Sequence, residues 1–164
     1  MMTRPAAAFG SILFFVLAPG TVAGLIPGWI TRWDLSWSNP PLIVIGATWV
    51  VVGLIALVCC FARFATDGSG TPAPVAPTKS LVVTGLYRRV RNPMYLAVAM
   101  ILFGQALMFA SAALIAYGLV VWLAFQAFVL TYEEPTLRVT YGDQYTAYSA
   151  AVPRWIPRLR PWSP

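Results

Sequence analysis

The chain has 164 residues, of which 59% are hydrophobic and only 10% are charged, and its formal net charge is +6. Because soluble domains carry about 25% charged residues, this composition indicates a protein solvated mostly by lipid. The chain has no histidine, which excludes histidine-based triads, zinc sites and haem ligands. The adjacent Cys59 and Cys60 suit neither a disulfide framework nor a spaced metal site.

Runs without charged residues predict four membrane-spanning helices, because one crossing needs roughly 20 apolar residues. The expected spans are residues 6–30, 40–62, 93–109 and 113–132. The first run ends in a predicted interfacial belt of Trp29, Trp33 and Trp37, and its alternative interpretation is a cleaved secretory signal. The second run opens on Pro40 and Pro41, where proline is tolerated at a helix start.

Residues 63–92 form a predicted cytoplasmic loop. Pro72, Pro74 and Pro77 forbid a continuous helix there. One interpretation is a proline-rich tether. The other is a functional segment, since a connection this long in a compact chain is usually either functional or disordered, and it leads directly into a cluster of arginines.

The third and fourth spans are predicted to form a helical hairpin that turns near residues 110–112. Residues 92–132 carry no charged side chain, and the amides Gln105 and Gln126 within them are expected to bond neighbouring helices. A hairpin returns the chain to the side it left. We therefore expect the charges that flank it to meet at one membrane face, namely Arg88, Arg89 and Arg91 with Glu133 and Glu134.

Residues 133–164 form the predicted cytoplasmic C-terminal segment. Leu137, Tyr141, Tyr145 and Tyr148 recur at helical spacing, which predicts an amphipathic helix at the interface. The tail from residue 152 is expected to lie across lipid headgroups or to pack back on the domain. The predicted fold class is an all-α integral membrane protein, a single domain over residues 1–164 with about four transmembrane helices and this interfacial helix.

The positions of the basic residues predict an orientation. Ten of the eleven fall in segments that share one face of a four-span protein, and only Arg32 falls on the other. This is the positive-inside pattern. The net charge is therefore chiefly an orientation signal, with attraction to anionic headgroups as a second use, and it does not indicate nucleic acid binding.

The two charged clusters also have separate structural interpretations. The arginines can be topological markers, and Glu134 with Arg138 can be an ordinary helical ion pair. Together, however, fixed charges and tyrosine faces suit a zwitterionic ligand that carries a cation, such as S-adenosyl-L-methionine. An arginine would bind its carboxylate, glutamates its ammonium or ribose hydroxyls, and a tyrosine its sulfonium.

Four motifs resemble the isoprenylcysteine carboxyl methyltransferase and phospholipid methyltransferase superfamily. They are Gly85-x-Tyr87-Arg88-x-x-Arg91-Asn92-Pro93-Met94-Tyr95, Tyr132-Glu133-Glu134-Pro135-x-Leu137, Tyr141-Gly142-x-x-Tyr145-x-x-Tyr148 and Val152-Pro153-Arg154-x-Ile156-Pro157. A loop similar to that of bacterial members follows the second span, Gly70-Thr71-Pro72-Ala73-Pro74. The resemblance covers roughly residues 68–157.

This resemblance implies a helical methyltransferase of the bacterial inner membrane. Its active site would face the cytoplasm, bind S-adenosyl-L-methionine and admit a lipophilic acceptor from the bilayer. Asn92 stands where the carboxyl methyltransferases have histidine, as it does in the phosphatidylethanolamine N-methyltransferases. Because asparagine does not titrate near neutrality, a protein carboxyl acceptor is in doubt.

The expected site residues follow from these motifs. The cofactor-binding candidates are Gly85, Tyr87, Arg91, Asn92, Pro93, Tyr95, Glu133 and Glu134, and the catalytic candidates are Glu133, Glu134 and Arg138. The expected partners are membrane lipids and a lipophilic small-molecule or lipid acceptor, with no nucleic acid and no metal. Two other functions stay open, a non-catalytic protein that binds anionic lipid or a partner, and a nicotinamide-dependent membrane reductase.

Overall fold

The structure is a computed structural model that describes residues 16–36, 38–67 and 81–163. The early part of the first expected span, Trp37 of the tryptophan belt and the proline-rich loop at residues 68–80 lie outside these described residues. Everything described is helix, turn or irregular chain, so the all-α prediction is confirmed.

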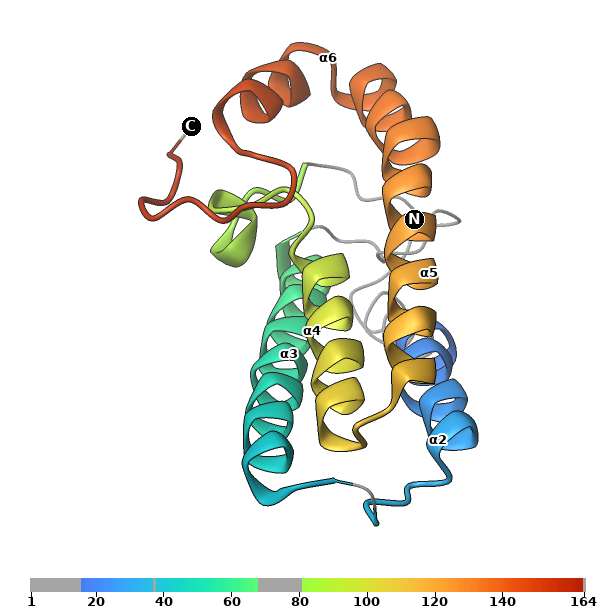
Figure 1. Cartoon of the computed structure of the whole chain (residues 1–164). Helices are drawn as coiled ribbons and strands as arrows, with labels where there is room; N and C mark the ends of the chain where they lie inside the picture. Colours follow the sequence, from blue (N-terminus) through green and yellow to red (C-terminus); the bar gives the residue numbers. More distant parts are fainter. Residues whose placement is uncertain (1–15, 37, 68–80, 164) are drawn as a thin grey trace.

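The helices follow the chain in a simple up-and-down order (Figure 1). Residues 16–20 are helical and lead into a π-helix, η1 (Thr21–Leu25), and then into α2 (Ile26–Thr31). The long helix α3 (Pro40–Asp67) begins at the predicted proline and runs past the predicted end. After the undescribed loop come a 3-10 helix and the hairpin: η2 (Gly85–Arg88), α4 (Pro93–Met108) and α5 (Ala112–Phe128).

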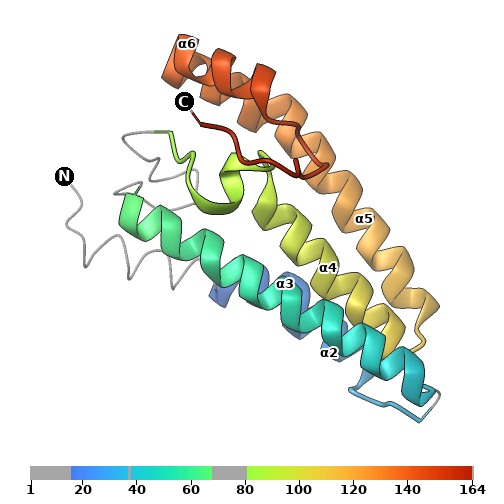
Figure 2. The ribbon, with the colours of Figure 1, turned by 90° about the vertical axis from the view of Figure 1, so that its left-hand side faces the viewer.

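Beyond α5 the helix continues without a break through a π-helix, η3 (Val129–Glu133), into α6 (Glu134–Ala151). The predicted turn of the hairpin is confirmed, since α4 ends at Met108 and Ser111 caps α5 by accepting a hydrogen bond of 3.3 Å from the Leu114 amide. Both ends of the hairpin therefore lie at the same end of the bundle, next to η2 and the C-terminal tail (Figure 2).

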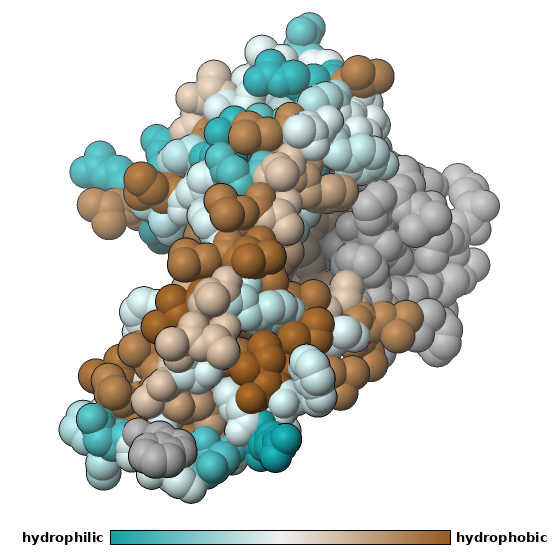
Figure 3. All heavy atoms as spheres, turned by 45° about the vertical axis from the view of Figure 1, so that its right-hand side comes forward, coloured by the Kyte–Doolittle hydropathy of each residue, from teal (hydrophilic) through white to brown (hydrophobic). Residues whose placement is uncertain are grey.

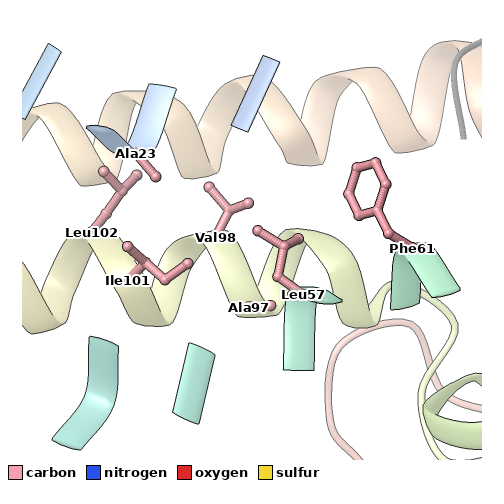
Figure 4. Packing of buried hydrophobic residues seen from close by; sticks show 7 residues of the cluster. All are labelled: Ala23, Leu57, Phe61, Ala97, Val98, Ile101 and Leu102. Atoms are coloured by element: carbon pink, nitrogen blue, oxygen red, sulfur yellow. The ribbon is translucent and has the colours of Figure 1, made fainter. Parts of the chain in front are cut away.

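Helices α3 and α4 pack closely because glycines remove side chains from their contact. A Cβ atom on Gly46 would lie 2.4 Å from the Gly104 carbonyl oxygen, and one on Gly53 would lie 2.8 Å from the Ala97 carbonyl oxygen. Figure 4 shows the core beside this contact, where η1, α3 and α4 contribute Ala23, Leu57, Phe61, Ala97, Val98, Ile101 and Leu102.

Two helices are long and apolar enough to cross a membrane by length and composition, Pro40–Phe64 and the continuous helix Ala112–Ala151. The helices Val16–Thr31 and Pro93–Met108 are also apolar but shorter. Large apolar side chains are exposed on α3 and α5, including Val44, Val120 and Leu123, which are 65%, 65% and 66% exposed. In Figure 3 hydrophobic residues occupy the middle of the surface and hydrophilic residues gather at its two ends, as suits a lipid-embedded bundle.

The predicted amphipathic helix is present but is interrupted by a kink at Gly142. Gly142 has φ 50° and ψ −124°, a left-handed conformation that favours glycine, so α6 turns sharply there and its two halves point in different directions (Figure 1). Leu137 and Tyr141 precede the kink, yet they still pack against Tyr145 and Tyr148, which follow it. The kink therefore folds the aromatic stripe over the end of the bundle.

The tail after α6 packs back on the protein. The Trp162 and Arg158 amides donate to the carbonyl oxygens of Arg88 and Arg89 at 2.8 and 2.9 Å. Of the two predicted arrangements for the tail, packing on the domain is the one observed.

Candidate functional site

A cavity of about 740 Å³ lies where the hairpin, α3 and α6 converge. Its polar wall comes from the start of α4, the end of η3 and α6, and includes Tyr87, Arg91, Asn92, Tyr95, Tyr132, Glu133, Glu134, Tyr141, Tyr145 and Tyr148. Its apolar wall includes Pro19, Val22, Leu57, Phe61, Val98, Phe125 and Phe128. One cavity thus joins a charged, tyrosine-rich end to a hydrophobic end that reaches the level of the core.

The charged end is held together by Glu134 at the start of α6, which is buried. Arg91 Nη1 lies 3.0 Å from Glu134 Oε1. Arg154, from the tail, grips the same carboxylate with two bonds, Nε to Oε1 at 2.6 Å and Nη2 to Oε2 at 3.0 Å. Bidentate arginine contacts fix a carboxylate in position as well as neutralising it, so Glu134 is locked between two guanidinium groups.

Glu133 has a different partner. The Tyr95 hydroxyl donates a hydrogen bond of 2.7 Å to Glu133 Oε2. The π-helix η3 ends at Glu133, and π-helical turns commonly occur at functional sites because the extra residue re-aims the side chains that follow. Glu133 therefore bonds a tyrosine and the adjacent Glu134 bonds two arginines, and both carboxylates line the cavity.

The pKa values of the Glu133 and Glu134 carboxyl groups are shifted in opposite directions. Both lie beyond Tyr132, where the charge-free run of this helix ends. Burial raises the pKa of Glu133 above its usual 4.5, the negative charge of Glu134 adds to this, and the bond from Tyr95 opposes it. Burial also acts to raise the pKa of Glu134, but the hydrogen bonds from Arg154 and the positive charge of Arg91 outweigh it and hold that pKa below 4.5.

Tyrosines form the rest of the polar wall. Arg91 Nη1 donates to the Tyr145 hydroxyl at 3.2 Å, and the Tyr148 hydroxyl donates to the Tyr87 carbonyl oxygen at 2.7 Å. Tyr145 and Tyr148 come from the part of α6 beyond the Gly142 kink, so the kink is what brings their rings to the cavity.

The structure brings together most of the predicted site. Of the predicted residues, Tyr87, Arg91, Asn92, Tyr95, Glu133 and Glu134 line the cavity. Three others do not line it, Gly85, Pro93 and Arg138. Gly85 has φ 57° and begins η2, Pro93 begins α4, and the Arg138 guanidinium lies 5.9 Å from the Tyr145 ring centre, which places these three in supporting positions.

Arg88 and Arg89 do not join the carboxylates, contrary to prediction. Arg88 Nε donates to the Trp162 carbonyl oxygen, and Arg89 Nη1 donates to the carbonyl oxygens of Arg158 and Leu159. These two arginines hold the tail instead. Arg91 is the arginine of the cluster that reaches the cavity.

Arg154 is a site component that the sequence prediction left out. Its motif, Val152-Pro153-Arg154, was recognisable, but nothing in the spacing indicates that an arginine 20 residues after Glu134 returns to it. The same short stretch also fixes the start of α4, since Pro153 O accepts from the Arg91 amide at 3.0 Å and Arg154 O accepts from Asn92 Nδ2 at 3.2 Å.

The predicted roles of the two amides are partly confirmed. Gln105 Nε2 donates to the Ala23 carbonyl oxygen at 2.7 Å and so joins α4 to η1. Gln126 Oε1 accepts a bond of 2.6 Å from Trp155 Nε1, so its partner is the tail rather than a helix. The Trp155 ring also lies near Trp122, with ring centres 4.6 Å apart.

One donor of the site has no partner. Arg91 Nε is buried and makes no hydrogen bond within the described residues, and both contacts recorded for this guanidinium use Nη1. A buried unpaired donor on a cation is costly. Arg91 itself is among the residues that line the cavity.

Comparison with known proteins agrees with this arrangement. The family model described as "Phospholipid methyltransferase" matches residues 41–144, which is more than half of the chain and includes α3, the hairpin and both glutamates. No curated protein matches the chain closely enough to count as a relative.

Proposed function

The chain belongs to the phospholipid methyltransferase family and is a methyltransferase, and from this premise we propose that it methylates a lipophilic acceptor with S-adenosyl-L-methionine in the cavity between Arg91 and Glu133. Methyltransferases of this family use S-adenosyl-L-methionine and act on lipid. The single observation that carries the proposal for this chain is the cavity that brings Arg91, Glu133 and several tyrosine rings together.

Family membership decides among the three functions that the sequence left open. Membership of a phospholipid methyltransferase family supports the methyltransferase, and neither the non-catalytic lipid-binding protein nor the nicotinamide-dependent reductase has such support. Basic residues and the tryptophan-containing tail are then parts of an enzyme.

The residues present fit the cofactor. Arg91 has donors left for a carboxylate, Glu133 bonds the Tyr95 hydroxyl alone among the described residues, and several tyrosine rings line the cavity. These are the groups that an amino acid with a sulfonium requires, since an aromatic face attracts a cation. Bound there, S-adenosyl-L-methionine would supply an electrophilic methyl group.

The chain's own residues supply alignment and exclude water. Arg91 is fixed from three sides, by Glu134, by the Tyr145 hydroxyl and through its amide by Pro153. Such fixed positioning is the main requirement of a methyl transfer, because holding two reactants in line removes most of the entropic barrier. The apolar cavity wall keeps the reacting groups from water, which strengthens the electrostatic contacts inside.

Glu133 is the candidate proton acceptor of the pair. Both oxygens of Glu134 are bonded to arginines, whereas Glu133 has one bond within the described part of the chain, from Tyr95. Its raised pKa brings it closer to the range in which a carboxylate exchanges protons with an acceptor. Glu134 serves to position the arginines, and Arg138, which lies outside the cavity wall, supports Tyr145.

The hydrophobic end of the cavity suits an acceptor with an apolar body. Phe125 and Phe128 on α5 line it together with Val22 and Pro19. The reacting group, whether amine, thiol or carboxylate, would lie next to Glu133. The proposed setting is a single membrane domain that crosses a bacterial inner membrane four times. The site would lie at the cytoplasmic face, which carries ten of the eleven basic residues. The first half of α6 would lie at the interface.

Calorimetry with S-adenosylhomocysteine on the detergent-purified full chain tests the proposal. We expect the wild type to bind and Glu133→Ala and Glu134→Ala to bind more weakly. Absence of binding, or binding undiminished in both variants, would contradict it. Incubating membranes with methyl-labelled S-adenosyl-L-methionine and identifying the labelled extract would then name the acceptor.

A further inference from the structure

Arg154 competes with Arg91 for one carboxylate, and this competition determines how many donors Arg91 has left. Glu134 has two oxygens. Arg154 occupies both of them with bonds of 2.6 and 3.0 Å, while Arg91 reaches only Oε1, with Nη1 at 3.0 Å. Arg91 is therefore held by one nitrogen, and its Nε stays unpaired.

We propose that Arg154 is a positioning residue for the cofactor site: by gripping both oxygens of Glu134, it prevents a two-point ion pair between Glu134 and Arg91 and keeps Arg91 free to bind the cofactor carboxylate. The inference rests on the proposed function. Arg154 does not line the cavity, so it acts through Glu134 and Arg91 rather than on the ligand.

The surroundings of Arg154 make this role specific. Its backbone carbonyl accepts a bond from Asn92, and the neighbouring Pro153 carbonyl accepts one from the Arg91 amide. The stretch at residues 153–154 thus holds the Arg91 backbone directly and its side chain indirectly. Without the Arg154 guanidinium the backbone contacts remain, but Glu134 Oε2 loses its bond from Arg154 and becomes available to a second Arg91 nitrogen. Two-point pairing of a buried arginine and carboxylate is favoured because each leaves fewer unpaired groups.

The experiment measures S-adenosylhomocysteine binding by the purified full chain, by four variants and by Glu134→Gln, the background of the fourth. Arg154→Gln is expected to weaken binding roughly tenfold, because the loss of one hydrogen bond to a charged group typically changes affinity by about this factor. Arg154→Lys keeps the charge but bonds one oxygen at a time, so it should fall between Arg154→Gln and the wild type. Arg89→Gln is the matched control, because Arg89 holds the same tail through Arg158 and Leu159 without contacting Glu134, and it should bind within about twofold of the wild type.

The fourth variant separates positioning from a merely structural role. In the Glu134→Gln background, Arg154→Gln should cause almost no further loss, because Arg154 acts through the carboxylate that is already gone. Effects that only loosen the fold would add. Thermal unfolding of each variant shows whether it is folded, and if Arg154→Gln does not fold, Arg154→Lys in both backgrounds carries the same test.

The outcomes are distinct. Wild-type binding with an unaffected Arg154→Gln, an equal loss in Arg89→Gln, or a full additional loss in the Glu134→Gln background would each overturn the role of Arg154 alone. A wild type that does not bind S-adenosylhomocysteine would overturn the proposed function and this inference together.

Discussion

The hydroxyl of Tyr95 and the carboxylate of Glu133 join the two ends of the α4–α5 hairpin through a hydrogen bond of 2.7 Å between residues 38 positions apart in the chain. The bond closes the hairpin at the end where the cavity lies. Tyr95 is also packed against Phe125, with ring centres 4.7 Å apart, so its hydroxyl is aimed by aromatic contacts with α5. A single tyrosine thereby fixes both the helix spacing and the orientation of a site carboxylate.

Tyr95→Phe should weaken S-adenosylhomocysteine binding roughly tenfold while keeping the fold, since the ring contacts remain and one bond to a charged group is lost. The measurement is calorimetry beside thermal unfolding in detergent. Tyr117→Phe is the control. It removes a tyrosine hydroxyl that bonds the Val22 carbonyl oxygen at 3.0 Å, outside the charged end of the cavity, and it should leave affinity unchanged. If Tyr95→Phe and the wild type bind S-adenosylhomocysteine with equal affinity, then the Tyr95 hydroxyl does not position Glu133 for ligand binding.

Arg91→Lys should weaken binding more than Tyr95→Phe, by roughly 100-fold. Lysine keeps the charge, but its three N–H donors lie on one nitrogen, so they cannot reach Glu134, Tyr145 and the cavity from separate positions as the three nitrogens of a guanidinium can. The matched change is Arg88→Lys, because the Arg88 guanidinium bonds the Trp162 carbonyl oxygen in the tail. Titration of both variants with S-adenosylhomocysteine checks the prediction, which fails if the two lose affinity equally.

Much of this fold could be predicted because lipid imposes a simple rule on the sequence. Spans are free of charge, so the starts of α3 and α4 could be predicted from Pro40, Pro93 and the charged residues that precede them. The hairpin turn near residues 110–112 could be predicted from the length of the charge-free run. The meeting of Arg91 with the glutamates also followed, since a hairpin of equal arms must bring its two ends together. Local signals were sufficient wherever the outcome depended on helix length alone.

The remaining features depend on contacts that leave no local signal. Gly142 lies within a regular helical pattern, and only its observed φ of 50° shows that the helix turns there. The roles of Arg88 and Arg89 required knowing where a tail some 70 residues later would pack. Arg154 was missed for the same reason, because its partner is chosen by the tertiary fold rather than by helical spacing.

Gly46→Ala should destabilise the protein by about 2 kcal/mol, as overpacking of a tight contact does. The added Cβ would lie 2.4 Å from the backbone oxygen of Gly104, so α3 and α4 would have to separate. Gly24→Ala is the control, because an added Cβ there meets nothing within 4 Å. Thermal unfolding in one detergent compares them. A midpoint for Gly46→Ala at or above that of Gly24→Ala would show that the helix contact adapts at no cost.

Binding of S-adenosylhomocysteine should weaken as the pH is lowered from 7 toward 5. Burial raises the pKa of Glu133 above 4.5, so this carboxylate takes up a proton earlier than an exposed one does and then no longer attracts the ligand ammonium. Glu134 stays ionised over the same range, because its arginine partners hold its pKa below 4.5. The sign follows from linkage: a ligand that requires the ionised form of Glu133 competes with its proton, and its affinity falls as protons are added. Calorimetry at a series of pH values checks this, with Glu133→Gln as the variant in which the dependence should be flat. A flat profile in the wild type, or an unchanged slope in Glu133→Gln, would show that Glu133 does not bind the ligand cation.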